Sequence, residues 1–275
     1  MESEDAHIEG WNRFFAHAVR TWAESRSVTY EFSFGDWLIR LEKDGVVKYI
    51  EWCDIGLNTS AQHLVAKDKS ATSHILEREG IPHVEHTLVL RPQSKGWLPQ
   101  QVQLVQEFFA QHNNDVVIKP NTGAGGTEVV RATTYNEGVS ILEKLFLTHR
   151  ALALSPFVVC VSEYRVTVLD TEVLHMYEKR HAPDPTEFRF NLAHGATAHE
   201  VPQNDWEAVA VLARAAQHAL GGRFMNIDIV RLSDGTMRVM EINGSVAFEK
   251  YVLTSDEAEA RALESYARAL DALFT

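Results

Sequence analysis

The chain has 275 residues, of which 45% are hydrophobic and 23% charged, and its formal net charge is -12. This composition excludes intrinsic disorder. So acidic a chain is a poor nonspecific nucleic-acid binder, and no apolar run reaches the ~20 residues that cross a bilayer. The acidic N-terminus lacks the apolar stretch of a signal peptide, and Cys53 and Cys160 form no CxxC pair. We therefore expect a cytoplasmic protein that binds neither nucleic acid nor a membrane.

In chain order, apolar residues at helical spacing predict a helix over 8–24, and a hairpin is expected from strands over 37–41 and 46–50. The middle of the chain is predicted to hold helices over 69–79, 99–111 and 136–147 and strands over 116–118 and 128–131. The last part is predicted to hold strands over 157–161, 165–169, 173–178, 225–232 and 237–242, a polar loop over 183–201, and helices over 205–220 and from 255 onward. Without strict βαβ alternation, this order indicates an α+β class, or irregular α/β lobes, rather than one doubly wound sheet.

The last hairpin is predicted to bring two carboxylates together. Asp234 and Gly235 form the preferred centre of a two-residue type I′ turn, and counting outward from it places Asp228 opposite Glu241. Asn243 then faces the same way. Opposed like charges destabilise a sheet unless something compensates them, and hard divalent cations prefer such oxygen ligands. We therefore predict a metal site, the alternative being an acidic strand pair that faces solvent.

A glycine-rich loop follows the buried strand that ends at Lys119. The loop residues are Gly123, Ala124, Gly125, Gly126 and Thr127. Such a loop exposes backbone N–H groups that can wrap phosphate oxygens, and a lysine at a strand end can meet a phosphate as a point charge. The loop has neither the Gly-Lys-Ser/Thr ending of a Walker A loop nor the last glycine of GxGxxG. A plain turn is the alternative.

Basic residues cluster in the C-terminal part, at Arg165, Lys179, Arg180 and Arg189. Arginine and lysine aligned on strands suit a polyphosphate or a carboxylate substrate. The alternative is salt bridging to Glu163, Glu178 and Glu187. His83 and His86 have no second histidine pair, and we interpret them as surface residues beside a proline rather than as a zinc site.

These motifs occur together in the order of a known superfamily. The chain resembles the ATP-grasp carboxylate–amine ligases, and most of all the ATP-grasp module of cyanophycin synthetases and related peptide and glutamate ligases. The resemblance runs from about Ile39 to the C-terminus and rests on the segments Ala66–Lys69, Gly80–Pro82, Val117–Pro120 with 123–127, Arg165, Phe188–Gly195, and Asp228 with Glu241 and Asn243. The chain departs from the family pattern at three places. Ala196 stands where a glycine is usual, residues 153–157 differ from the usual sequence of the adenine hinge, and residues 244–248 replace a loop that commonly contains a proline. It is also too short for the further domains of a cyanophycin synthetase.

The resemblance implies an α+β ATP-grasp fold of three lobes, residues 1–65, 66–155 and 156–275, with ATP between the last two. By the same resemblance, Lys69 and Lys119 hold the nucleotide phosphates, the 123–127 loop covers them, and Ser155 and Phe157 belong to the adenine hinge. One or two Mg²⁺ ions, or Mn²⁺ in their place, are expected at Asp228, Glu241 and Asn243. Arg165, Lys179 and Arg189 are the expected catalytic residues, which stabilise the transferring phosphoryl group or the substrate carboxylate.

The activity that the resemblance implies is the ATP-dependent joining of a small-molecule carboxylate to an amine. An amino acid or a peptide would be the substrate, an acyl phosphate the intermediate, and ADP, phosphate and an amide the products. The sequence leaves open whether the protein forms a homodimer. An ATP-grasp kinase would use the same residues, whereas a non-catalytic nucleotide-binding protein would be expected to have lost metal ligands that are intact here.

Overall fold

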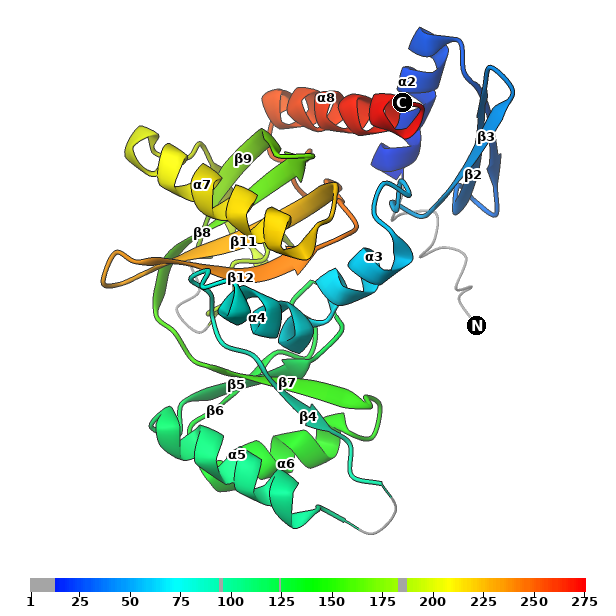
Figure 1. Ribbon diagram of the computed structural model, residues 1–275. Helices are drawn as coiled ribbons and strands as arrows, with labels where there is room; N and C mark the ends of the chain where they lie inside the picture. Colours follow the sequence, from blue (N-terminus) through cyan, green and yellow to red (C-terminus); the bar gives the residue numbers. More distant parts are fainter. Residues whose placement is uncertain (1–12, 94–95, 124, 183–186) are drawn as a thin grey trace.

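The computed structural model describes residues 13–93, 96–123, 125–182 and 187–275. Among them, helices pack against three antiparallel sheets (Figure 1). This arrangement confirms the predicted α+β class. None of the helices in these ranges is both long enough and apolar enough to cross a membrane.

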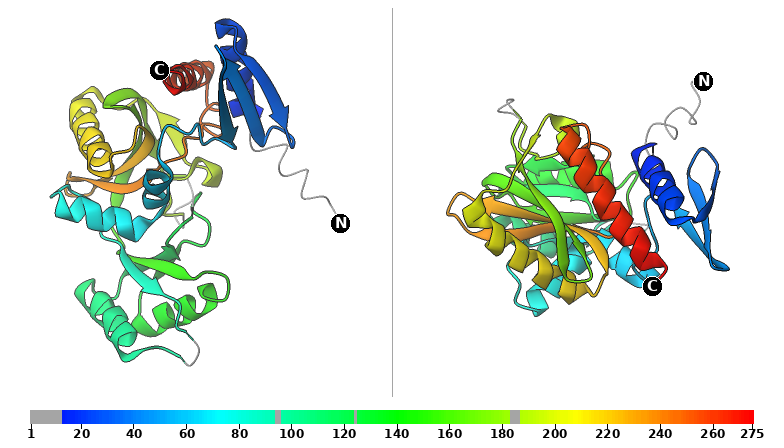
Figure 2. Two further views of the ribbon diagram at one scale, coloured as in Figure 1. Left: turned by 45° about the vertical axis from the view of Figure 1, so that its right-hand side comes forward. Right: turned by 90° about the horizontal axis from the view of Figure 1, so that it is seen from above.

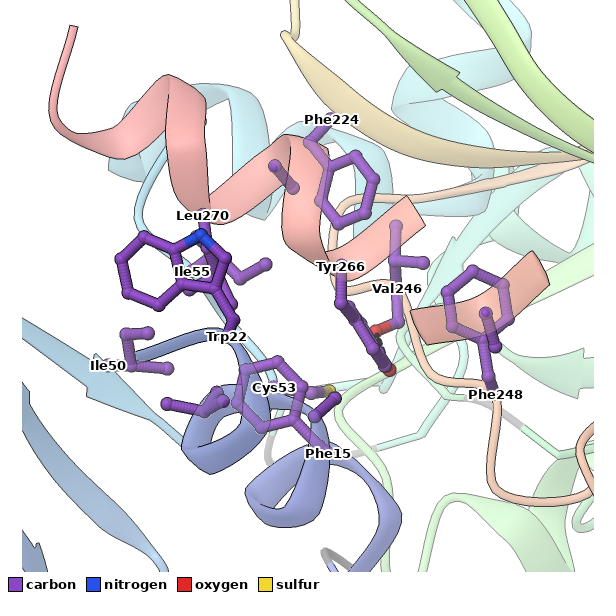
Figure 3. Close-up of a cluster of buried hydrophobic side chains, with 14 of the residues drawn as sticks. Phe15, Trp22, Ile50, Cys53, Ile55, Phe224, Val246, Phe248, Tyr266 and Leu270 are labelled. Atoms are coloured by element: carbon purple, nitrogen blue, oxygen red, sulfur yellow. Dashed lines mark hydrogen bonds between the residues drawn. The ribbon is translucent and has the colours of Figure 1, made fainter. Parts of the chain in front are cut away.

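The first sheet, with strand order β1-β2-β3, lies beside helix α2 (Arg13–Arg26). Its strands are β1 (Thr29–Ser33), β2 (Leu38–Lys43) and β3 (Val46–Glu51). The predicted hairpin is confirmed as β2 and β3, β1 was not anticipated, and residues 8–12 of the predicted helix lie outside the described residues. Helix α2 packs against the C-terminal helix α8 (Asp256–Leu273), so the two ends of the chain share one core. Figure 3 shows Trp22 from α2 in this core with Tyr266 and Leu270 from α8.

The central sheet has the order β4-β7-β5-β6, and α5 (Pro99–Gln111) and α6 (Tyr135–Leu145) lie beside it (Figure 1). Its strands are β4 (Thr87–Leu90), β5 (Val116–Pro120), β6 (Val130–Ala132) and β7 (Ala151–Pro156). Strands β4 and β7 were not predicted. The strand predicted over 157–161 is wrong, because β7 already ends at Pro156 and the next strand begins only at Cys160.

The C-terminal sheet has the order β10-β9-β8-β11-β12. Its strands are β8 (Cys160–Leu169), β9 (Glu172–Arg180), β10 (Thr197–His199), β11 (Phe224–Leu232) and β12 (Met237–Asn243), and α7 (Gln203–Leu220) covers one face. Strand β10 lies within the segment predicted as a polar loop and pairs with β9. Residues 183–186 of that predicted loop lie outside the described residues. This sheet therefore has one face packed on α7, and part of its second face, with Leu169, Tyr177 and Phe224, joins the core shared with α2 and α8.

Two short helices connect the first sheet to the rest, as the turned views of Figure 2 show: α3 (Ser60–Lys67) and α4 (Lys69–Arg78). The side chains of Asp68 and Asn121 hold the start of α4, whereas Leu76 packs in the core of the C-terminal sheet. After α4, the chain runs along β12, since Val84 N donates to Val239 O (2.9 Å) and Val239 N to Pro82 O (2.9 Å). Helix α4 thus packs with the C-terminal sheet although it lies inside the predicted 66–155 lobe, and the lobe boundaries stay a prediction.

Candidate active site

The β11–β12 hairpin places Asp228 directly opposite Glu241, as the sequence predicts. The route to this register differs from the predicted one. The turn spans three residues, because Leu232 N donates to Thr236 O (2.9 Å) and Gly235 takes the left-handed conformation. A β-bulge after Asp228 then shifts the register by one residue. The two deviations cancel, so the predicted carboxylate pair is correct although the predicted two-residue turn is wrong.

Asp228 is neutralised by two cations from neighbouring strands. Arg165 Nε donates to Asp228 Oδ1 (2.9 Å) and Arg165 Nη2 to Oδ2 (2.7 Å), while Lys179 Nζ donates to Oδ1 (3.0 Å). Lys179 also pairs with Glu163, its cross-strand partner. Burial alone would raise the pKa of Asp228, but Arg165 and Lys179 outweigh burial and hold that pKa well below its usual range. The predicted repulsion between opposed carboxylates is thus offset by protein cations.

Two lysines from different elements approach Glu241. Lys69, the first residue of α4, has its Nζ 3.7 Å from Glu241 Oε2 and donates to the carbonyl of Gly123 (2.7 Å). Lys119, in β5, is buried, and its Nζ has no hydrogen bond or ion pair to any residue that the structure describes. Burial lowers the pKa of Lys119 to about 8, with Glu241 opposing the shift and Lys69 adding to it. A buried ammonium without a partner is suited to an anionic ligand such as a phosphate.

Asn121 fixes the start of the glycine-rich loop to α4. Its buried Oδ1 accepts hydrogen bonds from Ser70 N (3.1 Å) and Ser70 Oγ (2.9 Å), and its carbonyl accepts one from Lys69 N (3.1 Å). These bonds hold Lys69 and the loop in one unit. Sequence reasoning missed Asn121, for which the one available signal was its place between Pro120 and the glycines.

The far side of the loop rests on the segment that carries Arg189. Arg189 Nη1 donates to the carbonyl of Gly126 (2.8 Å), and its other nitrogens form a bidentate pair with Glu187 (2.7 and 2.6 Å). A Cβ atom on Gly126 would lie 2.6 Å from Asn191 Oδ1, so this contact admits only glycine without a shift. Thr127 is exposed, and Ala124 lies outside the described residues.

The predicted salt-bridge alternative holds for much of the basic cluster: Arg180 pairs with Glu178, Arg189 with Glu187, and Lys179 with Glu163. These pairs do not remove the cations from the site, because Lys179 also contacts Asp228 and Arg189 also contacts the loop.

The predicted hinge residues lie where β7 leaves the central sheet. Ser155 is buried opposite Val117 of β5. Phe157 N donates to Asp115 O (2.9 Å), and the Phe157 ring packs edge-to-face on Phe188, with ring centroids 5.8 Å apart. Its other neighbour is the Arg131 guanidinium, 3.5 Å from the ring centroid. This packing joins the end of β7 to the segment that leads into Arg189.

Comparison with known proteins identifies the fold and the family. Residues 66–264 match the RimK-like ATP-grasp domain family. The chain belongs to this family. A probable alpha-L-glutamate ligase of Mannheimia succiniciproducens is 28% identical over 145 residues, which are 52% of this chain and 47% of that protein. The chain therefore matches about half the length of this curated relative.

Solved structures share the ATP-grasp fold with this RimK-like chain. D-alanine–D-alanine ligase from Bacillus anthracis, complexed with ATP, has a TM-score of 0.59 at 19% identity and covers 79% of this chain and 67% of its own. A bifunctional glutathione synthetase from Pasteurella multocida has a TM-score of 0.59 at 13% identity and covers 94% of this chain and 44% of its own. At such identities the likeness supports the fold alone.

The predicted metal ligands of this ATP-grasp chain share one face of the β11–β12 hairpin. Asn243 Nδ2 lies 3.4 Å from Asp228 Oδ2, and Glu241 stands opposite Asp228. Two carboxylates and an amide oxygen are hard donors that suit Mg²⁺, so the donor set fits the ion. Within the described residues, no group of three His, Cys, Asp or Glu side chains is arranged to hold a metal. The ion would thus depend on Asn243 and on other oxygen donors.

The interpretation of both histidines as surface residues is wrong for His86. His86 is buried, and its Nδ1 lies 2.8 Å from the carbonyl oxygen of Val84. His83 is partly buried and makes the same kind of contact to Ile81 O (2.9 Å). The sequence showed a proline nearby but not the pairing of residues 82–84 with β12, which draws the next residues inward.

Proposed function

We propose that this chain is an ATP-dependent carboxylate–amine ligase, or the ATP-grasp part of one. The observation that carries the proposal is a convergence of charges where the central and C-terminal sheets meet. Three groups lie there: the Lys119 ammonium, which has no partner in the part of the chain that the structure describes, the loop-bound Lys69, and the Asp228–Glu241 pair. Phosphates need cations, and a divalent ion needs oxygen donors, so both requirements of a Mg-nucleotide are met at one place.

Each group has a role in this proposal. Lys69 and Lys119 bind the nucleotide phosphates, and Ser155 with Phe157 borders the adenine. The 123–127 loop, held by Asn121 at one end and by Arg189 at the other, excludes the water that would hydrolyse an acyl phosphate. Asp228, Glu241 and Asn243 would hold Mg²⁺, which neutralises phosphate charge when bound.

The basic residues orient the carboxylate substrate. Its oxygen attacks the γ-phosphorus and ADP leaves, and the amine then attacks the acyl carbon, loses a proton and expels phosphate. A carboxylate must approach a γ-phosphate that is itself negative, and cations lower that barrier. Arg165, Lys179 and Arg189 supply positive charge for this step. The name of the Mannheimia relative supports an amino acid, or a peptide that carries one, as substrate. A cytoplasmic location is part of the same proposal.

A screen of amino acids and small peptides tests the proposal. The purified chain is incubated with Mg-ATP and pairs of compounds, phosphate release is followed, and products are identified by mass. A ligase requires both a carboxylate and an amine and yields ADP, phosphate and an amide. A stable phosphorylated product without an amide would instead assign a kinase, and failure to bind Mg-ATP would reject both.

A further inference from the structure

His86 lies between the two elements that carry the charges of the candidate site. Its backbone N–H donates to Ser73 Oγ of α4 (2.9 Å), and its ring is buried beside β12. His86 lines a small cavity together with Lys69 and Glu241. The family resemblance gives this histidine no role, and the proposed mechanism does not use it.

The hydrogen bonding of the ring fixes its tautomer. The carbonyl oxygen of Val84, 2.8 Å from Nδ1, can only accept, so Nδ1 carries the proton. In the neutral ring Nε2 is then a bare acceptor. Burial and then the charges of Lys119 and Lys69 lower the pKa of His86 well below its usual value, which keeps the ring neutral. Nε2 is buried and has no partner among the described residues. A native core rarely leaves such an acceptor unsatisfied.

The cavity has room for the missing donor. Its volume is about 10 Å³, which is at the lower limit of the ~10–15 Å³ that a cavity needs to hold one water. Buried waters usually make about three hydrogen bonds. Lys69 and Glu241 line the same cavity as His86. The ammonium of Lys69 can donate and the carboxylate of Glu241 can accept, and the two groups stand 3.7 Å apart.

We propose that His86 is a positioning residue whose Nε2 holds a buried water between Lys69 and Glu241. The water donates one proton to Nε2 and the other to Glu241, and it accepts a hydrogen bond from Lys69. The bridge keeps the lysine and the carboxylate from collapsing into a tight ion pair, so that both stay available to a ligand. The water is a property of the folded chain, whereas its effect on Mg-ATP rests on the proposed function.

The water and the tautomer can be tested without any activity. A high-resolution crystal structure of the unliganded protein should show one water within hydrogen-bond distance of His86 Nε2, and the ¹⁵N shifts of the ring should be those of the neutral Nδ1–H tautomer. A dry cavity or an Nε2–H tautomer would overturn the proposal.

Substitutions test the consequence for the site. His86→Phe keeps a buried ring but removes the acceptor, and we expect the Kd of Mg-AMPPNP to rise about tenfold, as for the loss of groups that orient metal ligands. His86→Gln offers an amide oxygen and should restore most of the affinity. His83→Phe is the matched control, because His83 makes the same Nδ1 contact but does not line the cavity.

Two results would contradict the positioning role: a folded His86→Phe protein with wild-type affinity, or equal losses in the Phe and Gln variants. If the wild-type protein does not bind Mg-AMPPNP, the proposed function fails, and the crystallographic water still decides the role of His86.

Discussion

The two faces of the C-terminal sheet are built from the same strands. One face is apolar and packs on α7, whereas the other carries the charges around Asp228 beside an apolar part, Leu169, Tyr177 and Phe224, that joins the core with α8. In β8, Tyr164 and Val166 are fully buried in the core against α7, whereas Glu163 and Arg165, which alternate with them, join the charged network around Asp228. Successive side chains of a strand point to opposite faces, so one segment can serve both. The charged side chains of this sheet therefore need no separate scaffold, because the apolar face of the same strands fixes them in place.

The two faces also differ in how much they contribute to the stability of the fold. The face toward α7 gains about 25 cal/mol for each Å² of apolar surface removed from water. The charged part of the other face gains little, because the cost of desolvating ions offsets their attraction. The apolar face therefore supplies stability, and we assign the chemistry to the charged face. Variants on the two faces should separate these roles.

The largest difference should come from neighbouring residues of β12. Glu241→Gln keeps the side-chain volume but removes a charge from the proposed metal site, and we expect Mg-dependent ATP turnover to fall about a hundredfold or more with little change in Tm. Ile242→Val, on the buried face, should cost about 0.5–1.5 kcal/mol of unfolding free energy and leave turnover per folded molecule unchanged. Wild-type turnover in Glu241→Gln would show that the metal assignment is wrong.

Arg189 should affect the donor substrate more than the nucleotide. Hydrogen bonds to charged groups are worth about 1.5–3 kcal/mol, so Arg189→Ala should raise the KM of the carboxylate substrate about tenfold or more, while the Kd of ATP changes little. Arg180→Ala is the control, because the Arg180 side chain is 52% exposed in its pair with Glu178 and such pairs contribute at most about 1 kcal/mol. Equal effects of the two variants on donor KM would argue against a role for Arg189.

Local patterns predicted the parts of this site that depend on a few neighbouring residues. The Asp-Gly turn led to the Asp228–Glu241 pair, although the correct register arises from a longer turn and a bulge that cancel. The pairing of Lys179 with Glu163 and the burial of His86 depend on which strands become neighbours, and one sequence does not reveal that order. The role suggested for Lys69 came from the family resemblance alone, whereas Arg165 was also part of the basic cluster that the sequence shows.

The pH dependence of kcat/KM for ATP should reflect the protonation of the buried Lys119. The pKa of Lys119 is lowered to about 8 by burial, so kcat/KM for ATP should fall as pH rises through that value, about tenfold for each further unit. The unfolded-state pKa is ~10.4, so the folded protein loses this proton first and the free energy of unfolding should rise between about pH 8 and 10. Activity and stability thus move in opposite directions. Lys119→Arg should abolish the alkaline fall, and its persistence would assign the fall to another group.

The smallest effect should separate two adjacent glycines of the covering loop. Gly125 and Gly126 share a φ of +72°, so alanine at either position carries the same left-handed strain of ~1–2 kcal/mol. A Cβ on Gly125 meets nothing within 4 Å among the described residues, whereas a Cβ on Gly126 lies 2.6 Å from Asn191 Oδ1. The three atoms that this Cβ meets belong to the side chains of Asn191 and Arg189, which can shift, so relieving the contact should cost about 1 kcal/mol, or about fivefold in an equilibrium.

We therefore expect Gly126→Ala to lower turnover about fivefold more than Gly125→Ala, and to release more free phosphate per amide because the loop no longer seals the site. The double variant Gly126→Ala, Asn191→Ala removes the obstructing side chain and should return turnover to the level of Gly125→Ala. Parallel assays of phosphate and amide measure both rates. If the two single variants behave alike, backbone strain alone accounts for the loss of turnover, and the close packing of the loop on Asn191 does not contribute to closure.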